Sequence, residues 1–321
     1  MTRLRIATCT DPGARGGNED DLRHGSGTAG HYVVVADGAG GHARGEEASY
    51  LAVESVAREL AANSAAFTPE HLTAVVRGAH ANLLLAQEES RRPEHRMHTT
   101  LVALWVDTAL EHVLWTHVGD SRLYRVRHGV GELLTQDDSV VQHMVRSGML
   151  SAEQGRSHPQ KNHLLAALGI EGEINPHTVA RPIEVMEGDA FLLCSDGWWD
   201  TFEPNDIAAA LHRSDTPEQW LHDMRQQILK RASPRQDNYT AAAVWLGNPG
   251  EPTENVAITV KLRSMTEPVA ARLTLGPGGT ARVVLDEPQF GVAPGQACVF
   301  YSGSRVLGGG WIRREAAAKA A

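Results

Sequence analysis

Apolar runs of strand length follow one another directly between residues 100 and 127, with no helical segment between them. Strands this close in sequence pair antiparallel through hairpins, because a parallel pair needs a crossover of a dozen residues or more. Helical patterns lie instead between groups of strands, at residues 53–60 and 72–83. This order favours α+β layers over a doubly wound parallel sheet. The strand-like runs are residues 32–36, 100–106, 112–118, 190–194 and 240–246.

The character of the sequence changes near residue 248. The segment NPGEPTEN is typical of a linker, since Pro, Gly and Asn end regular elements. Beyond it, short strand patterns alternate with Gly/Pro turns, which predicts a small all-β domain. The expected organisation is a first domain at 1–247, a linker at 248–255, a small β-barrel domain at 256–313 and a helical tail at 314–321.

A helix start is predicted just before residue 217. Thr216 is a suitable N-cap, Pro217 occupies the first helical position, and Gln219 matches the capping-box partner. We therefore expect a helix that ends at about Arg231.

Charge and cysteine content narrow the class of protein. The formal net charge is −9, which argues against broad binding of nucleic acid or membranes and fits a site that gathers carboxylates around cations. Cys9, Cys194 and Cys298 are far apart and form no CxxC pair, so neither a disulfide framework nor a structural zinc site is predicted. No signal region or transmembrane stretch is evident, and we expect a soluble, cytoplasmic protein with no membrane partner.

Aspartates stand at the ends of several predicted strands. VVVADG places Asp37 after one run, HVGD places Asp120 after another, LLCSD places Asp196 after a third, and QDNYT places Asp237 just before a fourth. A single Asp after a strand is commonly a turn former or a helix cap. Side-by-side strands would bring these carboxylates into one cleft, where they repel one another unless they take up protons or cations. Oxygen ligands without a supporting His or Cys cluster favour Mg²⁺ or Mn²⁺.

The segment ARGGNEDD adds Arg15, Glu19 and Asp20 near the N-terminus. The planar guanidinium of Arg15 suits a phosphate, because it can donate two hydrogen bonds to two oxygens. A pair of divalent ions can lower the pKa of a bridging water and hold both ends of an in-line displacement at phosphorus. The residues thus indicate hydrolysis at phosphorus without a serine or cysteine nucleophile.

Taken together, the motifs resemble the metal-dependent protein phosphatases of the PPM/PP2C family in their bacterial form. The matching segments include RGGNEDD, VVVADGAGGHARGEEAS, THVGDSRLYRV, DAFLLCSDGWWD and QDNYTAAAV, in family order over about residues 3–247. The resemblance implies a four-layer α/β/β/α sandwich of two antiparallel sheets. It also implies a protein serine/threonine phosphatase that uses a metal-activated water, with phosphorylated proteins and Ser/Thr kinases as its partners.

The resemblance assigns the metal ligands residue by residue. It implies that Asp37 bridges two Mn²⁺ or Mg²⁺ ions and that Gly38 contributes its carbonyl. Asp196 and Asp237 would complete the shell of one ion, and Glu19 would act on the other through water.

Further roles come from the same resemblance. Asp120, together with Asp196, matches a third and weaker metal site, and Arg15 would hold the substrate phosphate. Asn238 is expected to order its loop, and residues 139–157 correspond to the flap beside the active site.

Two positions depart from the family pattern, and a third has two alternative roles. Ala39 stands where bacterial members usually have Met and animal members have a His that protonates the leaving group. His42 is expected to form structural hydrogen bonds, with general-acid catalysis as the alternative, and Asp138 stands where the flap motif commonly has His. These departures concern substrate handling, and the metal carboxylates are all present.

The C-terminal segment resembles a different family. DEPQ, APGQ, VFY and VLGGGWI, within residues 256–313, are similar to the C-terminal β-barrel domain of bacterial tRNA 2-thiouridylases, whose catalytic part is absent from this chain. RNA contact is one interpretation, and an accessory or dimerising module is the other. Tyr301 and Trp311 fit either barrel core or stacking platforms. The candidate phosphate contacts are Lys261, Arg263, Arg272, Arg282 and Arg305.

Two other functions stay open beside the protein phosphatase. A catalytically weak regulatory protein would bind phosphorylated partners, or RNA through its barrel, with negligible turnover in Mn²⁺. A phosphatase with the same chemistry could instead act on a small phosphoester.

Overall fold

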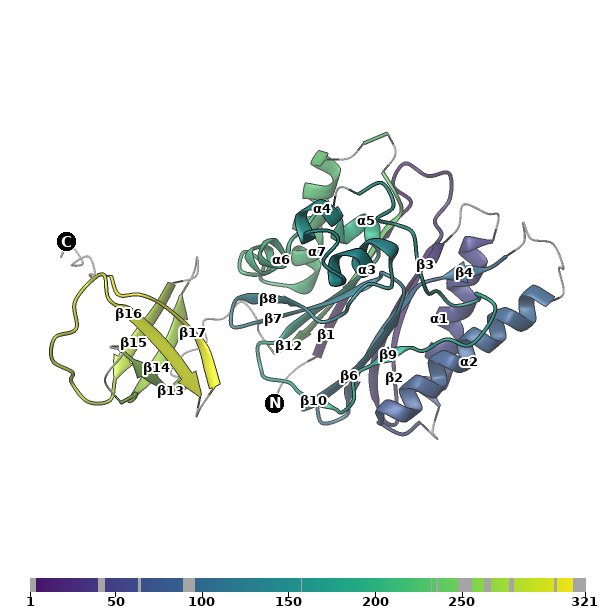
Figure 1. Cartoon of the computed structure of the whole chain (residues 1–321). Coiled ribbons are helices and arrows are strands. Elements are labelled where there is room, and N and C mark those ends of the chain that lie inside the picture. Colours follow the sequence, from purple (N-terminus) through teal and green to yellow (C-terminus); the bar gives the residue numbers. More distant parts are fainter. Residues whose placement is uncertain are drawn as a thin grey trace. The chain divides into compact units, whose positions relative to one another are not determined.

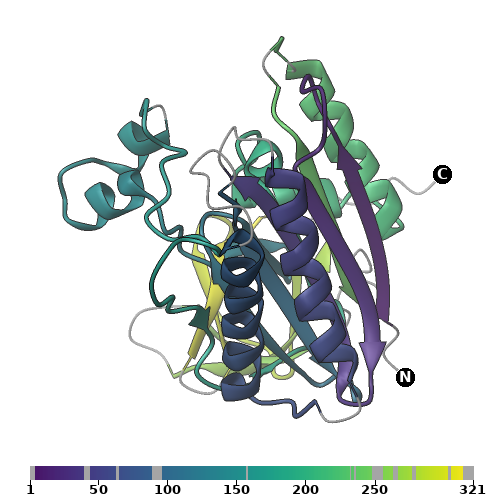
Figure 2. The same cartoon turned by 90° about the vertical axis from the view of Figure 1, so that its right-hand side faces the viewer.

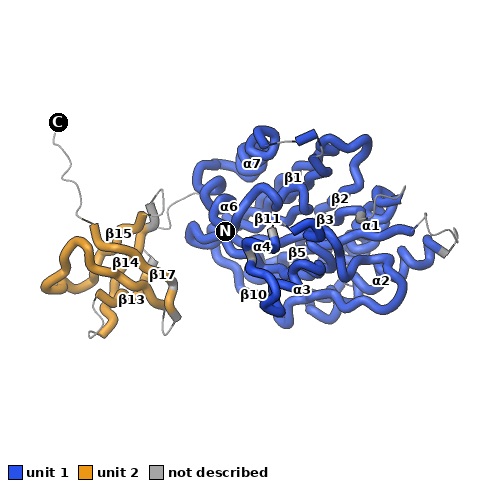
Figure 3. Tube along the Cα trace, turned by 45° about the horizontal axis from the view of Figure 1, so that its top comes forward, with its two compact units in different colours: residues 1–250 blue, residues 251–321 orange. Residues whose placement is uncertain are grey.

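The computed structural model separates into two compact units, residues 1–250 and residues 251–321 (Figure 3). The predicted linker at 248–255 and tail at 314–321 lie outside the residues that the structure describes. The described residues are 4–39, 44–62, 65–88, 96–156, 158–231, 233–234, 236–247, 256–262, 267–276, 280–302 and 305–313.

The first unit is built around two antiparallel sheets. Its strands are β1 (Leu4–Asp11), β2 (Asp20–Gly27), β3 (Gly30–Ala39), β4 (His98–Thr99), β5 (Leu101–Asp107), β6 (His112–Val118), β7 (Arg122–Arg127), β8 (Val130–Leu133), β9 (His177–Thr178), β10 (Ile183–Glu184), β11 (Ala190–Cys194) and β12 (Tyr239–Leu246). One sheet has the order β1-β12-β11-β7-β8. The other has the order β10-β6-β5-β3-β2, with β4 paired to β3 and β9 paired to β6.

Helices cover the outer faces of these sheets (Figures 1 and 2). The described helices of the first unit are α1 (Gly45–Ala61), α2 (Pro69–Glu88), α3 (Val140–Arg146), α4 (Ala152–Arg156), α5 (Asp196–Trp199), α6 (Pro204–Leu211) and α7 (Pro217–Arg231), of which α3 and α4 project away from the sheets (Figure 2). Helices α1 and α2 pack on the sheet that contains β3 and β5, whereas α5, α6 and α7 pack on the sheet that contains β11 and β12. No described helix combines the length and the apolar character needed to cross a membrane.

Strand β3 shows why the apolar runs are continuous. Val33 and Val35 point into a core between the two sheets, whereas Val34 and Ala36 point into the core under α1 and α2. Successive side chains of a strand face opposite sides, so a strand that is covered on both sides needs apolar residues throughout. The predicted α+β class and the four-layer α/β/β/α sandwich are confirmed.

The element predictions hold in part. The five strand-like runs are all strands, but β1, β2, β4, β7, β8, β9 and β10 have no counterpart among them, although β7 lies within the strand-rich stretch 100–127. Thr216 caps α7 as predicted, because its Oγ1 accepts a hydrogen bond of 3.1 Å from the backbone N–H of Gln219. The capping-box prediction expects the Gln219 side chain to accept from the N–H of Thr216. It is wrong on this point, since the side chain accepts from the N–H of Asp215 at 3.1 Å.

The second unit is an all-β sheet with a small core. Its strands are β13 (Val256–Lys261), β14 (Val269–Gly276), β15 (Thr280–Leu285), β16 (Ala297–Ser302) and β17 (Arg305–Trp311), all paired antiparallel in the order β15-β14-β13-β16-β17. A register shift at Phe300/Tyr301 bends the β16–β17 pair, as bulges do. The core residues are Ile258, Val260, Ala271, Leu273 and Cys298.

Candidate metal centre

The centre of the site is Asp37, near the end of β3. Its backbone is fixed by neighbouring threonines, because the Asp37 carbonyl accepts from Thr100 N–H at 2.8 Å and from Thr99 Oγ1 at 2.9 Å. The Asp37 N–H donates to Thr100 Oγ1 at 3.1 Å. On β2, Asp20 stands directly opposite Asp37 in the strand register. Directly opposite residues of an antiparallel pair place their side chains on the same face, so two carboxylates meet here.

Asp196 and Asp237 reach the same place from the other sheet. Asp196 begins α5 two residues after β11, and Asp237 lies two residues before β12. Ser195 joins the two sheets, because its hydroxyl donates to Asp20 Oδ2 at 2.7 Å and accepts from Thr240 N–H at 3.0 Å. This buried serine holds Asp20 beside the strand ends that carry Asp196 and Asp237.

Asp120 completes the cluster in the turn between β6 and β7. Its carbonyl accepts a hydrogen bond of 2.9 Å from the indole N–H of Trp199. Arg122 lies 3.5 Å above the Trp199 ring and forms a two-point ion pair with Asp137, at 2.7 and 2.9 Å. A stacked and paired guanidinium is a rigid support, so the turn that presents Asp120 is well fixed.

The electrostatics show that these five aspartates share one environment. Burial raises the pKa of Asp37 well above its ordinary value, and the charges of Asp20, Asp196, Asp120 and Asp237 raise it further. Burial also raises the pKa of Asp120 well above its usual range, followed by the charge of Asp196. The pKa of Asp196 rises to about 7, chiefly through burial and then through the charge of Asp237. Ionised together, these groups need positive charge nearby.

The donor set fits divalent cations. Burial raises the pKa of Asp20 to about 6, despite the hydrogen bonds from Ser195 and Thr240 that favour its charged form. Its Oδ1 is buried and has no hydrogen-bond partner among the described residues. A buried carboxylate oxygen without a donor, among several other carboxylates, is what a hard cation or its bound water would satisfy.

Arg15 lies at the exposed rim of this cluster. Its Nη2 donates to Asp237 Oδ2 at 2.8 Å, and the side chains are 54% and 37% exposed. Asn238 orders the loop that carries Arg15, as predicted, since its amide donates to the carbonyls of Pro12 and Gly17 at 2.9 Å each. The Asn238 amide oxygen accepts from the backbone N–H of Glu19 at 2.8 Å. One residue beside Asp237 thus sets the path of the whole loop.

Gly38 and Gly45 let the end of β3 lie against the start of α1. A Cβ on Gly38 would lie 2.4 Å from the Gly45 carbonyl oxygen, which is too close for any side chain. A Cβ on Gly45 would lie 2.7 Å from Cδ of Glu19, so the Glu19 carboxylate rests at the start of this helix. The structure therefore places Glu19 and Gly38 with Asp37, as the family resemblance implies, while their metal roles stay predictions.

Some predicted features cannot be placed. His42 and the side chain of Ala39 lie outside the described residues, so their roles stay predictions. The flap contains α3 and α4, and its Ser157 is also outside the described residues. Asn162 in the following segment donates to Asp196 Oδ2 at 3.0 Å, a contact that sequence reasoning missed. Cys194 is fully buried, as predicted for a core residue.

A second group of possible metal ligands, which the sequence analysis did not predict, lies outside the set of aspartates. His117 of β6, Asp138 and His177 of β9 can each offer one ligand atom, all within 4.8 Å of one another. The rings of His117 and His177 stack with centroids 4.9 Å apart. Burial lowers the pKa of His117 below its ordinary value. We call these three residues the histidine cluster.

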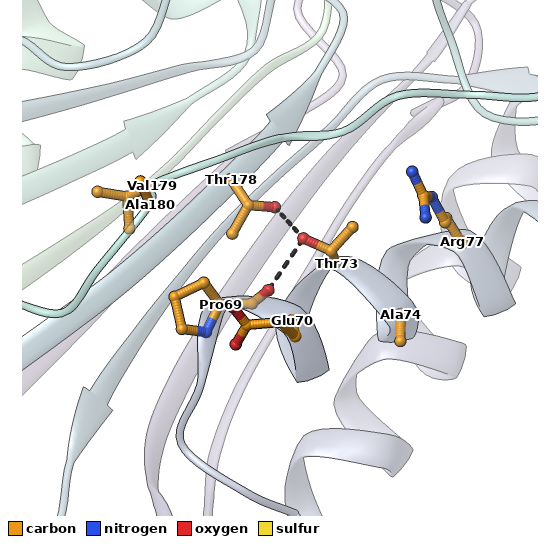
Figure 4. Close-up of a pocket in the computed structure, with 8 residues that line it drawn as sticks. All are labelled: Pro69, Glu70, Thr73, Ala74, Arg77, Thr178, Val179 and Ala180. Carbon is orange, nitrogen blue, oxygen red and sulfur yellow. Dashed lines mark hydrogen bonds between the residues drawn. The ribbon is translucent and has the colours of Figure 1, made fainter.

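A separate pocket of about 600 Å³ lies between α2 and β9 (Figure 4). Thr73 and Arg77 of α2 and Thr178 of β9 are among its walls. Thr73 Oγ1 donates to Thr178 Oγ1 at 2.8 Å, which ties the helix to the strand. None of the carboxylates of the metal centre lines this pocket, so we do not place the chemistry there.

The second unit presents its aromatic and basic residues differently. The Trp311 side chain is 73% exposed, so it is no core residue, while Tyr301 is half-buried. Arg272 and Arg282 are exposed on β14 and β15. Arg263 and the side chain of Arg305 lie outside the described residues.

The fold and site define a protein with a multi-carboxylate cluster, a candidate metal centre, at the strand ends of an α/β/β/α sandwich. A model of the protein phosphatase 2C family matches residues 15–237. The chain therefore belongs to the protein phosphatase 2C family. A second model, of the aminomethyltransferase beta-barrel domain, matches residues 235–312.

Individual proteins agree with these matches. The serine/threonine phosphatase stp of Listeria monocytogenes is 38% identical over 168 residues, or 51% of this chain and 65% of its own length. The crystal structure of the Mycobacterium tuberculosis phosphatase PstP/Ppp has a TM-score of 0.67 at 31% identity and covers 77% of this chain and 100% of that chain. A PstP structure in complex with two manganese ions has a TM-score of 0.66 at 29% identity, with the same coverage.

The second unit has its own relative. A tRNA-specific 2-thiouridylase of Rhodospirillum centenum is 57% identical over 76 residues, which are 24% of this chain and 19% of that protein. This chain thus spans about 65% of the Listeria phosphatase and only a small part of the thiouridylase. The chain combines a phosphatase-family unit with a β-barrel module that is found in a tRNA-modifying enzyme.

Proposed function

We propose that this chain is a metal-dependent phosphatase that removes phosphate from phosphoserine and phosphothreonine in proteins. The observation that carries the proposal is the cluster of five aspartates at the strand ends, where burial and then the charges of neighbouring aspartates raise the pKa of Asp37 and Asp196. The names of the Listeria and Mycobacterium relatives support the substrate class. One or more Ser/Thr kinases would supply the phosphorylated proteins.

The chain's own residues suit a pair of hard divalent cations. Asp37 would hold both ions and Gly38 would contribute its carbonyl, with Asp196 and Asp237 on one ion and Glu19 acting on the other, mainly through water. Such ions, when bound, neutralise the carboxylates and supply a water of lowered pKa. Both Mn²⁺ and Mg²⁺ accept oxygen ligands of this kind. Asp120 and Asp196 would hold a third, weaker ion.

Arg15 is the proposed phosphate-binding residue. Its guanidinium already pairs with a carboxylate oxygen of Asp237, and its 54% exposure leaves it accessible from solvent. The hydrogen bond from Arg15 to Asp237 raises the pKa of the guanidinium, so Arg15 stays cationic. A substrate phosphate at this rim would share the guanidinium with Asp237 and be oriented beside the cluster. Asn238 would preserve this geometry through its contacts to the Arg15 loop.

The test is the release of phosphate from a phosphothreonine peptide, with and without Mn²⁺. We compare the native chain, Asp196→Asn, and Asp215→Asn as a matched control, since Asp215 is an exposed carboxylate before α7. We expect metal-dependent turnover that survives in the control and disappears in Asp196→Asn. If the chain hydrolysed small phosphoesters but not the phosphopeptide, its substrates would be small phosphoesters and not proteins. Tight binding of phosphopeptides without turnover in any metal would favour the regulatory protein.

A second candidate function is RNA contact through the second unit, and we propose it on a specific arrangement. Arg272 stands opposite Val284 in the β14–β15 register, so Arg282 is on the diagonal of the same exposed face. Guanidinium groups on one face can contact successive phosphates. We would titrate labelled transfer RNA with the full chain over a range of salt. Arg282→Ala should reduce the slope of log affinity against log salt concentration by about one, the value for one phosphate contact. Arg58→Ala in α1 should leave this slope unchanged.

A further inference from the structure

The histidine cluster is separate from the carboxylate cluster and comes from three segments. Strands β6 and β9 pair with His117 directly opposite His177, so both imidazoles stand on one face. Asp138 enters from the segment between β8 and α3, and its Oδ1 lies 2.8 Å from Nε2 of His177. Two imidazoles and one carboxylate thus converge from elements that are distant in sequence.

The hydrogen bonds of His117 leave one ring nitrogen ready to bind a metal. Nε2 of His117 lies 2.8 Å from the carbonyl oxygen of Gln136, and a carbonyl only accepts, so Nε2 carries the proton. Nδ1 is then the nitrogen with a lone pair, and it is buried with no hydrogen-bond partner among the described residues. The side chain is only 1% exposed. Metal-binding histidines commonly donate their other N–H to a backbone carbonyl in this way.

His177 is held in place from the opposite face of its short strand. The hydroxyl of Thr178 contacts Thr73 Oγ1 of α2 at 2.8 Å and Thr116 Oγ1 of β6 at 2.9 Å (Figure 4 shows the first of these). These contacts fix the register of β9, although it has two residues only. The His177 side chain itself is 49% exposed, so a cation can enter from solvent.

We propose that His117, Asp138 and His177 form a binding site for one d-block divalent cation that prefers imidazole ligands, with Zn²⁺ as the expected ion. Two nitrogens and one carboxylate oxygen, with a remaining position for water, are a common zinc ligand set. The hard ions of the carboxylate cluster have little preference for imidazole. Binding through Nε2 of His177 replaces the hydrogen bond between His177 and Asp138. The His177 ring gives its Nε2 proton to solvent and carries one proton on Nδ1, so it binds as a neutral imidazole.

The position of Asp138 connects this site to the flap. Its Oδ2 accepts from the N–H of Gly119, which precedes Asp120, at 3.1 Å. The next residue, Ser139, caps α3 by accepting from the N–H of Gln142 at 3.1 Å. A bound cation would therefore pin the base of the flap and the turn that presents Asp120.

The test measures metal binding by the full chain without any substrate. Excess Mg²⁺ is added first to occupy the carboxylate cluster, and Zn²⁺ is then titrated against a competing chelator. Co²⁺ in place of Zn²⁺ reports the ligands, since a four-coordinate site with nitrogen ligands absorbs visible light much more strongly than a six-coordinate oxygen site. We compare the native chain, His177→Ala, and His163→Ala, an exposed histidine that follows the flap.

We expect one Zn²⁺ to remain bound in excess Mg²⁺ in the native chain and in His163→Ala. His177→Ala should weaken this binding by roughly 100-fold or more, because loss of an outer-shell partner alone already costs about 10–100-fold. The strong Co²⁺ absorption should disappear with it. If His177→Ala does not fold, His177→Gln keeps a hydrogen-bonding side chain and serves instead. Equal Zn²⁺ affinity in the native chain and the variant would overturn the proposal. The cluster would then be only an ion pair between His177 and Asp138 beside the stacked rings of His117 and His177.

Discussion

The two units of the chain use polar and aromatic residues in opposite ways. The first unit buries charged groups, with Asp20 only 7% and Asp120 only 4% exposed. The second unit leaves large apolar residues at its surface, with Phe290 96% and Trp311 73% exposed. Burial of an unpaired carboxylate costs several kcal/mol, so it stays ionised only where a cation compensates its charge.

We interpret this contrast as a division between the proposed reaction centre and a proposed contact surface. The carboxylates of the first unit lie where strand ends from two sheets meet, held by Ser195 and the backbone of β3. The exposed rings and guanidinium groups of the second unit face solvent, where they suit a partner. The following predictions test this division, from the largest effect to the smallest.

Asp37→Asn should abolish turnover and weaken Mn²⁺ binding by roughly 100-fold or more, because one change removes a proposed ligand of both ions. It should also stabilise the metal-free protein, since the buried Asp37 carboxylate is opposed by four other aspartates. The measurements are calorimetric Mn²⁺ titration and thermal unfolding in chelator. Asp286→Asn in the second unit is the matched control, as an exposed carboxylate near Arg272. Equal Mn²⁺ affinity in both variants would contradict the proposed role of Asp37 as a metal ligand and with it the contrast between the two units.

Arg15→Lys should reduce kcat/KM for a phosphopeptide by about 10–100-fold, because a charge-assisted hydrogen bond contributes about 1.5–3 kcal/mol and an ammonium cannot form the two-point contact. Mn²⁺ affinity should stay nearly unchanged, since Arg15 is no metal ligand. Steady-state kinetics with Arg58→Lys of α1 as control would check this. Unchanged kinetics in Arg15→Lys would remove Arg15 from phosphate binding.

Much of the fold was predictable because the central strands are apolar on both faces. Strand β2, with the sequence DDLRHGSG, escaped prediction. It is an edge strand of its sheet and partly exposed, so it lacks the apolar signal on which strand prediction depends. Strand β1 is likewise an edge strand with a mixed burial pattern.

The site was predictable to the extent that its residues follow or precede strong strands. Asp20 was noticed, but its importance depends on lying opposite Asp37, and that register cannot be read from the sequence. The histidine cluster was missed for the same reason. His177 belongs to a strand of two residues, and its pairing with His117 is set by contacts between distant segments.

Gly38→Ala should destabilise the first unit by about 1–3 kcal/mol, because overpacking against a fixed backbone forces a shift of β3 or α1. The new Cβ would lie 2.4 Å from the Gly45 carbonyl oxygen. Gly310→Ala in β17 is the control, since a Cβ there meets nothing within 4 Å. Denaturant unfolding followed separately for the two units would show the difference. Equal stability of both variants would contradict the close approach of Gly38 to the backbone of Gly45.

Metal binding should release protons below about pH 7. The folded-state pKa is about 6 for Asp20 and about 7 for Asp196, both raised from 3.8 by burial. Raised carboxyl pKa values mean that the metal-free protein loses stability as the pH rises from about 4 to about 7. Mn²⁺ binds the ionised groups, so its affinity should rise over the same range and then level. Calorimetry in buffers of different ionisation enthalpy would count the protons, and no proton release at pH 6 would contradict the shifts.

The smallest effect is expected from removing the second unit. A chain that ends at Gly247 keeps both sheets and all three cores of the first unit, and a unit with its own core generally folds alone. Its kcat/KM for a short phosphopeptide should stay within about twofold of the native value, since a short peptide contacts the metal centre only. Binding of transfer RNA should be lost in the same chain. If truncation instead reduced peptide turnover more than tenfold while the unfolding transition persisted, the second unit would contribute to catalysis, and the division between reaction centre and contact surface would fail.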